Sequence, residues 1–190
     1  MGKGMYQYLG EAWRNLDRET KQSRLIKWRA SESIVKVEKP LRLDRARALG
    51  YKAKKGIVVV RVRLLRGGRK RSRHTHGRKS RKQHVRKILK MSYKWVAEMR
   101  ASKKYPNLVV LNSYWVGKDG KHYYFEVILV DPSKPEIIND RVYNWTTKGE
   151  NSTRAERGLT SAAKKSRGLR THSKDMKVRP SLRAWDRRGK

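Results

Sequence analysis

The sequence contains no cysteine, and this absence excludes disulfide bonds and zinc sites built from thiolates. It has no apolar run long enough for a secretory signal or a membrane span, so we expect a cytoplasmic protein without membrane contact. Neither glycine-rich pattern that holds nucleotide phosphates, GxGxxG or GxxxxGK followed by Ser or Thr, is present. We therefore expect no nucleotide cofactor.

Acidic residues are also scarce. The chain has 51 Lys and Arg against 16 Asp and Glu, a net charge of +35 over 190 residues. Residues 61–90 carry 14 basic residues and no acidic one, whereas residues 105–150 carry 5 basic and 6 acidic residues. Because self-repulsion opposes compaction of such a chain, we expect a polyanion as partner, and a nearly neutral folded core between basic flanks.

The hydrophobic pattern predicts both helices and strands. Helical spacing of apolar residues predicts helices over residues 4–17, 19–34, 45–49, 85–99 and 155–165. Runs rich in β-branched residues predict strands at residues 57–65, 108–116 and 123–130. The pair Asp119-Gly120 is a strong hairpin signal, which makes the last two strands antiparallel. The order of elements favours an α+β fold: a small, largely antiparallel sheet packed with helices, plus a long basic loop and a C-terminal extension.

Two segments of the chain indicate contact with nucleic acid. Residues 69–84 contain no aliphatic side chain, and the loop from 66 to 84 offers about one cation for every two residues, a density similar to that of phosphates on a duplex. A merely solvated loop is less favoured, because residues 45–97 contain no acidic residue at all. In the strand at 57–65, alternation places Val60, Val62 and Leu64 on a core face and Arg61, Arg63 and Leu65 on a basic face.

Four aromatic residues stand among basic ones, and stacking on unpaired bases is chemically open to each: Trp28, Tyr51, Trp95 and Trp185. For Trp95 the helical spacing of its neighbours favours packing in the core. For Trp185 the surrounding tail offers little to pack against, so contact with nucleic acid or with a partner protein is favoured.

Two clusters are candidates for metal or catalytic sites. His74, His76 and His84 lie in a strongly basic segment without Cys or carboxylate, where a metal cation is repelled, so hydrogen bonds to phosphate or sugar are the better interpretation. Asp131, Glu136 and Asp140 could in principle hold Mg²⁺ in a nuclease, but turn formation and capping explain them. We expect no enzyme, and no protein-bound metal.

Several blocks of the sequence resemble one family. They are LGYKAKKG (49–56), VRVR (60–63), RGGRKR (66–71), LNSYWVG (111–117), YFEVILVDP (124–132) and RGLTSAAKKSRGL (157–169), with YQYLGEAWR (6–14) and RAWDRR (183–188) near the ends. Together they resemble the large-subunit ribosomal protein family fifteen of the archaeal and eukaryotic type. The resemblance is weakest from His74 to His84, and the short tail favours an archaeal member.

The resemblance implies a structural constituent of the large ribosomal subunit that binds and bridges large-subunit rRNA. Its expected partners are that rRNA and neighbouring large-subunit ribosomal proteins, with no small-molecule substrate and with Mg²⁺ only as a counterion of the RNA. A DNA-compacting chromatin protein is the alternative, and an RNA-modifying enzyme is a third class.

We accordingly divide the chain into three parts: residues 1–50, a helical region that packs on the core and on RNA; residues 51–148, the α+β core with the basic loop 66–84; and residues 149–190, a basic extension. The residues predicted to bind RNA are Lys52, Lys54, Lys55, Arg61, Arg63, Arg66, Arg69, Lys70, Arg71, Arg73, His74, Arg78, Lys79, Arg81, Lys82, Lys164, Lys165, Arg167, Arg170, Arg183, Trp185, Arg187 and Arg188.

Replacing Arg69, Lys70, Arg71 and Arg73 together by Ala is expected to weaken RNA binding and to lower its salt dependence, because fewer counterions are released on binding. The core should stay folded, since these residues have no aliphatic neighbours to pack against. Binding isotherms at several salt concentrations measure the slope. A slope equal to that of the unaltered protein would count against the loop.

Overall fold

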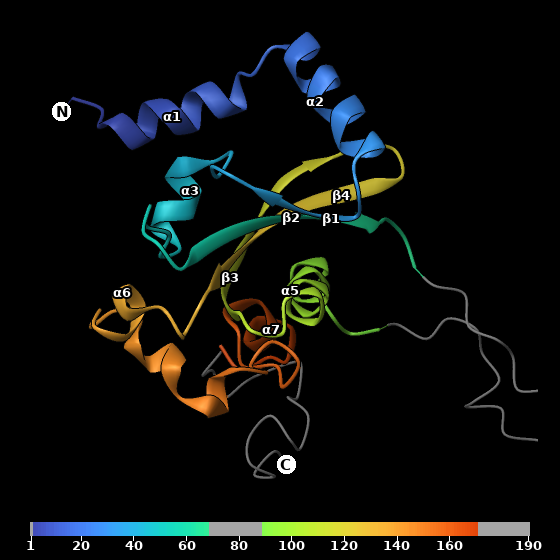
Figure 1. The fold of residues 1–190 in the computed structure, drawn as a ribbon. Helices are drawn as coiled ribbons and strands as arrows, with labels where there is room; N and C mark the ends of the chain where they lie inside the picture. The colour runs from blue at the N-terminus through green and yellow to red at the C-terminus, as the bar shows by residue number, and fades with distance from the viewer. Residues whose placement is uncertain (1, 69–88, 171–190) are drawn as a thin grey trace, which may run out of the picture.

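The computed structural model describes residues 2–68 and 89–170 (Figure 1). This part of the chain contains a four-stranded antiparallel sheet of order β1-β2-β4-β3, made of β1 (Ile34–Val37), β2 (Ile57–Leu65), β3 (Val109–Lys118) and β4 (His122–Val130). Its helices are α1 (Met5–Arg14), α2 (Arg18–Ala30), α3 (Leu43–Ala48), α5 (Tyr93–Lys104), α6 (Pro135–Ile138) and α7 (Ser161–Ser166), with 3-10 turns η1 (Asn144–Thr147) and η2 (Gly149–Asn151). The predicted α+β class with an antiparallel sheet is confirmed.

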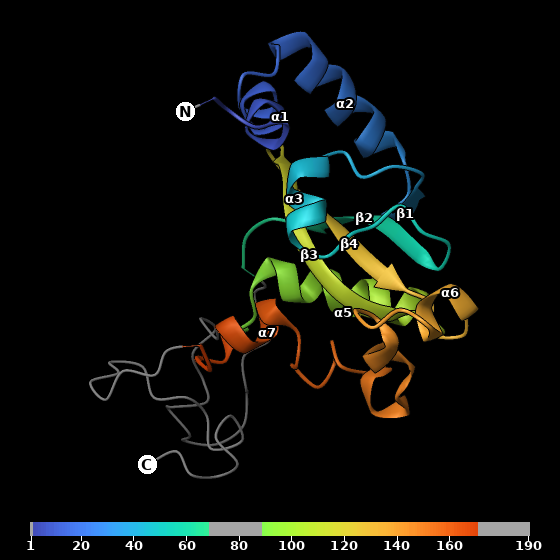
Figure 2. The same cartoon turned by 90° about the vertical axis from the view of Figure 1, so that its left-hand side faces the viewer.

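The sheet is covered on both faces, as Figures 1 and 2 show. Helices α2 and α3 lie over one face, where Trp28 and Ala46 pack with Val59, Tyr124 and Ile128. Helix α5 lies on the other face, where its Ala97 and Ala101 pack against side chains of the three longer strands. None of the described helices is both long enough and apolar enough to cross a bilayer.

Strand β4 is the centre of the core. Every residue from Tyr124 to Val130 is buried, because β2 and β3 flank the strand and helices cover both faces. Its connection to β3 is the expected hairpin: the Asp119 carboxylate accepts hydrogen bonds from the backbone N–H of Lys121 (2.8 Å) and His122 (2.5 Å). The Asp-Gly signal in the sequence therefore predicted this hairpin correctly.

The basic face predicted on β2 is covered by α2. Val59 lies on the same face as Arg61 and Arg63 and is only 2% exposed, because α2 packs over that face. The ring of Trp28 reaches across it, and a Cβ at Gly117 on β3 would lie 3.1 Å from that ring. A glycine at this position thus permits the close approach of α2 to the sheet.

Three predicted boundaries also differ from the structure. The second helix ends at Ala30 and not at residue 34, because Ile34 begins β1, a four-residue strand too short to give a pattern of its own. Residues 89–92 are not helical, since the Ser92 hydroxyl caps α5 by accepting from Trp95 N–H (3.3 Å). The remainder of the expected start of that helix, residues 85–88, lies outside the described residues. Helix α7 begins at Ser161, capped by Thr160.

Val127→Asp is expected to unfold the protein. The Val127 side chain is fully buried between the β2–β3–β4 sheet and α5, and an unpaired carboxylate there should cost more than about 4 kcal/mol of the free energy of unfolding. Urea denaturation measures the loss. The matched control is Val142→Asp, whose side chain is 54% exposed and which should change stability by less than about 0.5 kcal/mol. Equal effects of the two substitutions would contradict the assigned core.

Candidate nucleic-acid interface

Some of the cations predicted to bind RNA make contacts inside the protein. The Arg61 guanidinium lies 5.2 Å from the centre of the Trp28 ring and donates to the Ser31 hydroxyl (3.3 Å). Arg63 donates to the backbone carbonyls of Trp28 and Arg29. Both arginines therefore hold the last turn of α2, whose free carbonyls attract positive charge. Their contact with RNA stays a prediction, and their structural role was missed from the sequence.

Arg66 and Gly67, at the start of the basic loop, are bonded to other parts of the fold. Arg66 donates to the hairpin carbonyls of Asp119 (2.6 Å) and Gly120 (3.3 Å), and its guanidinium lies 5.0 Å from the centre of the Tyr123 ring. The Tyr93 hydroxyl accepts from Gly67 N–H (2.9 Å) and donates to Gly67 C=O (3.0 Å). The start of the loop is thus bonded both to the hairpin and to the first residue of α5.

Three more of the predicted cations have partners within the chain. The Lys54 ammonium forms an ion pair with Asp140 (2.7 Å), and that of Lys52 lies 4.0 Å from the same carboxylate. These contacts lower the pKa of Asp140: the hydrogen bond from Lys54 first, then the bond from Val142 N–H and the charge of Lys52. Arg167 donates to the carbonyl of Gly158 (2.9 Å). These cations are therefore held by partners within the protein.

Other predicted cations are exposed, and the described part of the chain gives them no hydrogen-bond or ion-pair partner: Lys55, Lys164, Lys165 and Arg170. The same holds for Arg45, which is exposed, and for Lys94, which is half-buried; the prediction missed both. No sequence pattern singles them out, because their neighbours in space come from distant parts of the chain. The remaining predicted residues lie outside the described residues: Arg69, Lys70, Arg71, Arg73, His74, Arg78, Lys79, Arg81, Lys82, Arg183, Trp185, Arg187 and Arg188.

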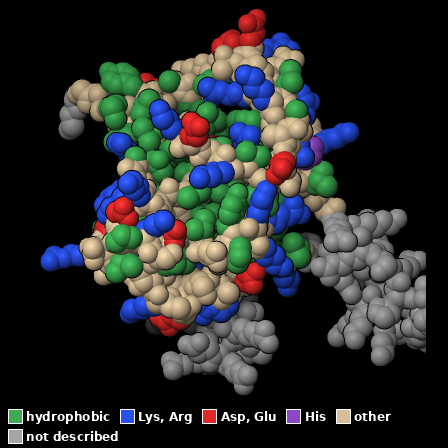
Figure 3. All heavy atoms as spheres, in the orientation of Figure 1, with side chains coloured by type: hydrophobic (Ala, Val, Ile, Leu, Met, Phe, Trp, Pro, Cys, Tyr) green, Lys and Arg blue, Asp and Glu red, His purple; other side chains and the backbone are tan. Residues whose placement is uncertain are grey.

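Basic side chains are spread over the visible surface. Figure 3 shows Lys and Arg over both the upper and the lower part of the molecule, with hydrophobic side chains and several Asp or Glu side chains between them. On α2, exposed Arg18, Lys21, Lys27 and Arg29 extend this surface around the helix. An arrangement of this kind suits the phosphates of a nucleic acid, whose charge repeats regularly along the backbone.

Two of the aromatic residues that could stack on bases lie in the core. Trp28 is 7% and Tyr51 9% exposed, so neither offers a free ring face. Trp95 is half-buried and donates its indole N–H to the Ala155 carbonyl (2.7 Å). Trp185 lies outside the described residues. Trp115 on β3, which the prediction did not consider, is 40% exposed.

Two glutamates are buried, one on each side of the sheet. Glu126 on β4 accepts hydrogen bonds from Tyr114 O–H and from Leu41 N–H (3.1 Å). Glu98 on α5 accepts from Ser113 O–H and Thr160 O–H, both at 2.5 Å. Burial raises the pKa of both carboxyls, although these hydrogen bonds and nearby cations act in the opposite direction.

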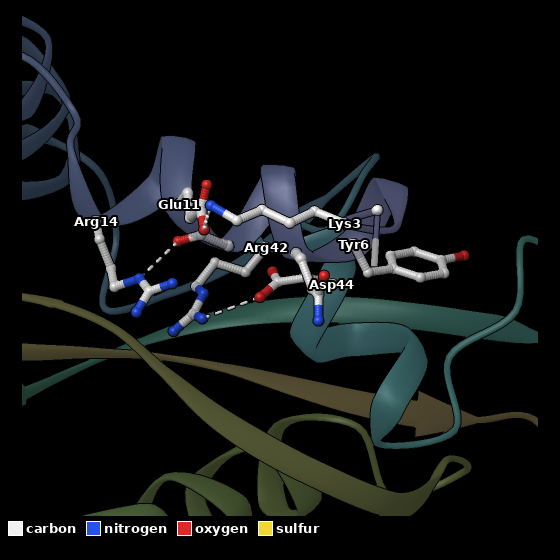
Figure 4. Close-up of a pocket in the computed structure, with 9 residues that line it drawn as sticks. Lys3, Tyr6, Glu11, Arg14, Arg42 and Asp44 are labelled. Atoms are coloured by element: carbon white, nitrogen blue, oxygen red, sulfur yellow. Dashed lines mark hydrogen bonds and ion pairs between the residues drawn. The ribbon is translucent and has the colours of Figure 1, made fainter.

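A hollow of about 700 Å³ lies between α1 and α3 (Figure 4). Its charged side chains pair with each other: Lys3 with Glu11 (2.9 Å) and Arg42 with Asp44 (3.1 Å). Arg14 donates to a carbonyl of its own helix. Because these cations already have partners, the hollow is a poor anion site, and its open shape gives no pocket for a small molecule.

Two of the three acidic residues that could form a catalytic site, Asp131 and Asp140, have structural partners. Asp131 accepts from Ser133 N–H (3.1 Å) and O–H (2.6 Å), and Asp140 accepts from Val142 N–H (2.9 Å). Their predicted role in turns is therefore confirmed. Within the described ranges, no three His, Asp or Glu side chains gather closely enough to hold a metal ion.

Comparison with known proteins gives a consistent result. The model of the Ribosomal L15 family matches residues 4–185. The large ribosomal subunit protein eL15 of Methanocella arvoryzae is 52% identical over an alignment that covers the whole of both chains, and that of Methanospirillum hungatei is 51% identical with the same coverage. Both relatives are archaeal, in agreement with the expectation from the short tail.

Basic side chains spread over a helix-covered antiparallel sheet suit a protein component of a nucleoprotein particle. The chain belongs to the Ribosomal L15 family, so it is a structural, non-enzymatic component of the large subunit of the cytoplasmic ribosome. The family resemblance predicted from the sequence blocks is confirmed.

The buried Glu98 should make stability depend on pH. Since the pKa of Glu98 is raised in the folded protein, the unfolded chain releases this proton first, and the free energy of unfolding falls as the pH rises above 4.5. In Glu98→Gln, which can still hydrogen-bond to both hydroxyls, this fall is absent. We expect the variant to gain stability relative to the unaltered protein between pH 4.5 and 7, by about 1.4 kcal/mol per unit of raised pKa.

Urea denaturation across this pH range measures the difference. Asn107→Gln is the control, because it changes an exposed side chain that carries no ionisable group, and its difference should stay constant with pH. A constant difference for Glu98→Gln as well would contradict the raised pKa.

Proposed function

We propose that this protein binds large-subunit rRNA and bridges separate RNA segments, through the exposed cations of its folded part together with the basic loop 66–84 and the extension 149–190. The observation that carries the proposal is a set of exposed Lys and Arg side chains without partners, on a chain of a large-subunit ribosomal protein family. Cations left unpaired in a chain of net charge +35 favour a polyanion as ligand.

The folded part and the cations have different tasks in this proposal. The sheet with helices on both faces supplies a rigid body, while Lys and Arg on its surface bind phosphates and fix its orientation on the RNA. Arg61, Arg63 and Arg66 act indirectly, by holding α2 and the base of the loop. Mg²⁺ at the interface would be held by the RNA, and neighbouring large-subunit ribosomal proteins are the expected protein partners.

A DNA-compacting role would use the same charge, but no comparison favours it. The two roles differ in preference: a chromatin protein coats duplex DNA at moderate salt, whereas a ribosomal protein prefers its own rRNA. The described surface alone does not distinguish the two roles, so the test measures the preference for rRNA over DNA directly.

Binding to a large-subunit rRNA transcript and to duplex DNA of equal total charge, each in 0.2 M salt, tests the proposal. We expect at least about tenfold tighter binding to the rRNA, because specific nucleic-acid binding exceeds non-specific binding by that factor or more. Co-sedimentation with large subunits in cell extracts provides the second measurement. Equal affinity for both nucleic acids, together with absence from the large subunit, would overturn the proposal.

A further inference from the structure

The charge of Lys94 lies within reach of cations from separate elements of the fold. Lys94 belongs to the first turn of α5, whose start is hydrogen-bonded to the end of α7, while α3 lies across the sheet from α5 (Figures 1 and 2). The charged groups that act most strongly on the Lys94 ammonium are Arg45 from α3, Lys165 from α7 and Arg170 beyond it, with Glu98 as the one acidic group among them. We name Arg45, Lys94, Lys165 and Arg170 the four-cation cluster.

Hydrogen bonds join the two elements that carry Lys94, Lys165 and Arg170. Ser92 N–H donates to the Ser166 hydroxyl (3.1 Å), which joins the start of α5 to the end of α7. Leu169 N–H donates to the Lys164 carbonyl (3.0 Å) and Gly168 has φ +74°, so the chain turns back on α7 just before Arg170. The backbone positions of these three cations are thus fixed relative to each other.

The cluster lacks neutralising partners within the described part of the chain. None of its four side chains forms a hydrogen bond or an ion pair. The nearest acidic group, Glu98, is fully buried and is already bonded to Ser113 and Thr160. Burial and the three neighbouring cations lower the pKa of Lys94, which reports that its charge is unfavourable in the free protein.

Several cations of this fold pair with carbonyls, rings or carboxylates, as for Arg63, Arg154 and Lys54. Arg154, for example, donates to the carbonyls of Val110 (2.7 Å) and Leu111 (3.1 Å), at an irregularity of β3. Other cations are unpaired but stand singly, whereas those around Lys94 act on one another. An anion from outside relieves the repulsion among them.

We propose that the four-cation cluster is a binding site for closely spaced backbone phosphates of large-subunit rRNA, as at a sharp turn of one strand or where two strands approach each other. The proposal rests on the proposed RNA binding and deepens it. Cations that converge from α3, α5 and α7 fit phosphates gathered in one place better than a straight row of them. The exposed Arg45 and Arg170 can each hold two phosphate oxygens with their planar guanidinium groups, and the lysines add point charges.

The test compares two variants that each remove four positive charges. The cluster variant is Arg45→Gln, Lys94→Met, Lys165→Gln and Arg170→Gln. The control variant is Lys36→Gln, Lys103→Gln, Lys118→Gln and Lys148→Gln, which are exposed, lie on separate elements and have no partners within the described ranges. Binding to a large-subunit rRNA transcript is measured at several salt concentrations, and hydroxyl-radical cleavage maps the protected RNA backbone.

We expect the cluster variant to lower the slope of log K against log salt by about 2 to 4, as each lost phosphate contact lowers it by about 0.7 to 0.9. It should also lose protection over one short backbone segment that the control variant still protects. The same loss of slope in both variants, with the same footprint, would overturn the cluster as a site. A transcript that binds the unaltered protein no better than duplex DNA would instead overturn the proposed function.

Lys94→Met alone separates binding from folding. The substitution keeps the apolar stem of the side chain and removes a charge that has no partner. We expect the melting temperature of the free protein to stay equal or to rise, while affinity for the transcript falls. A lower melting temperature with unchanged affinity would assign Lys94 a structural role and contradict the phosphate site.

Discussion

The fold depends on two carboxylates that are removed from water, one on each side of the sheet. Glu126 receives hydrogen bonds from β3 and from the segment that leads into α3, so it ties the upper helical layer to the central strand. Glu98 bonds to β3 and to the cap of α7, and so it ties the lower layer. A buried carboxylate is costly unless its hydrogen bonds are complete, so both networks favour one arrangement of the layers.

The few acidic groups of this chain are placed where they order cations. Glu126 stands opposite Arg61 in the ladder between β2 and β4, and Arg61 in turn contacts Trp28 of α2. Asp140 forms an ion pair with Lys54, and the Asp119 carboxylate in the hairpin accepts hydrogen bonds from backbone N–H groups. Cations inside such networks build the fold, whereas cations outside them keep their charge available for phosphate. One residue type therefore has two roles, and position decides between them.

The sequence predicted the parts of this molecule that depend on local chemistry. The Asp119-Gly120 turn, the alternating strand at Ile57–Leu65 and the turn roles of Asp131 and Asp140 follow from neighbouring residues alone. Strand β1 was missed, because four residues give no period, and the covering of Arg61 by Trp28 depends on two segments that are 33 positions apart. The meeting of Arg45, Lys94 and Lys165 likewise requires the tertiary fold, so no local pattern could reveal it.

The bonds between Tyr93 and Gly67 join two residues that are 26 positions apart in the sequence. Gly67 comes just after β2, and Tyr93 is the first residue of α5, so the folded part of the chain has one junction at which the central sheet and its covering helix are tied together. Any pull that a partner exerts on the intervening sequence therefore acts on the folded part at this single junction.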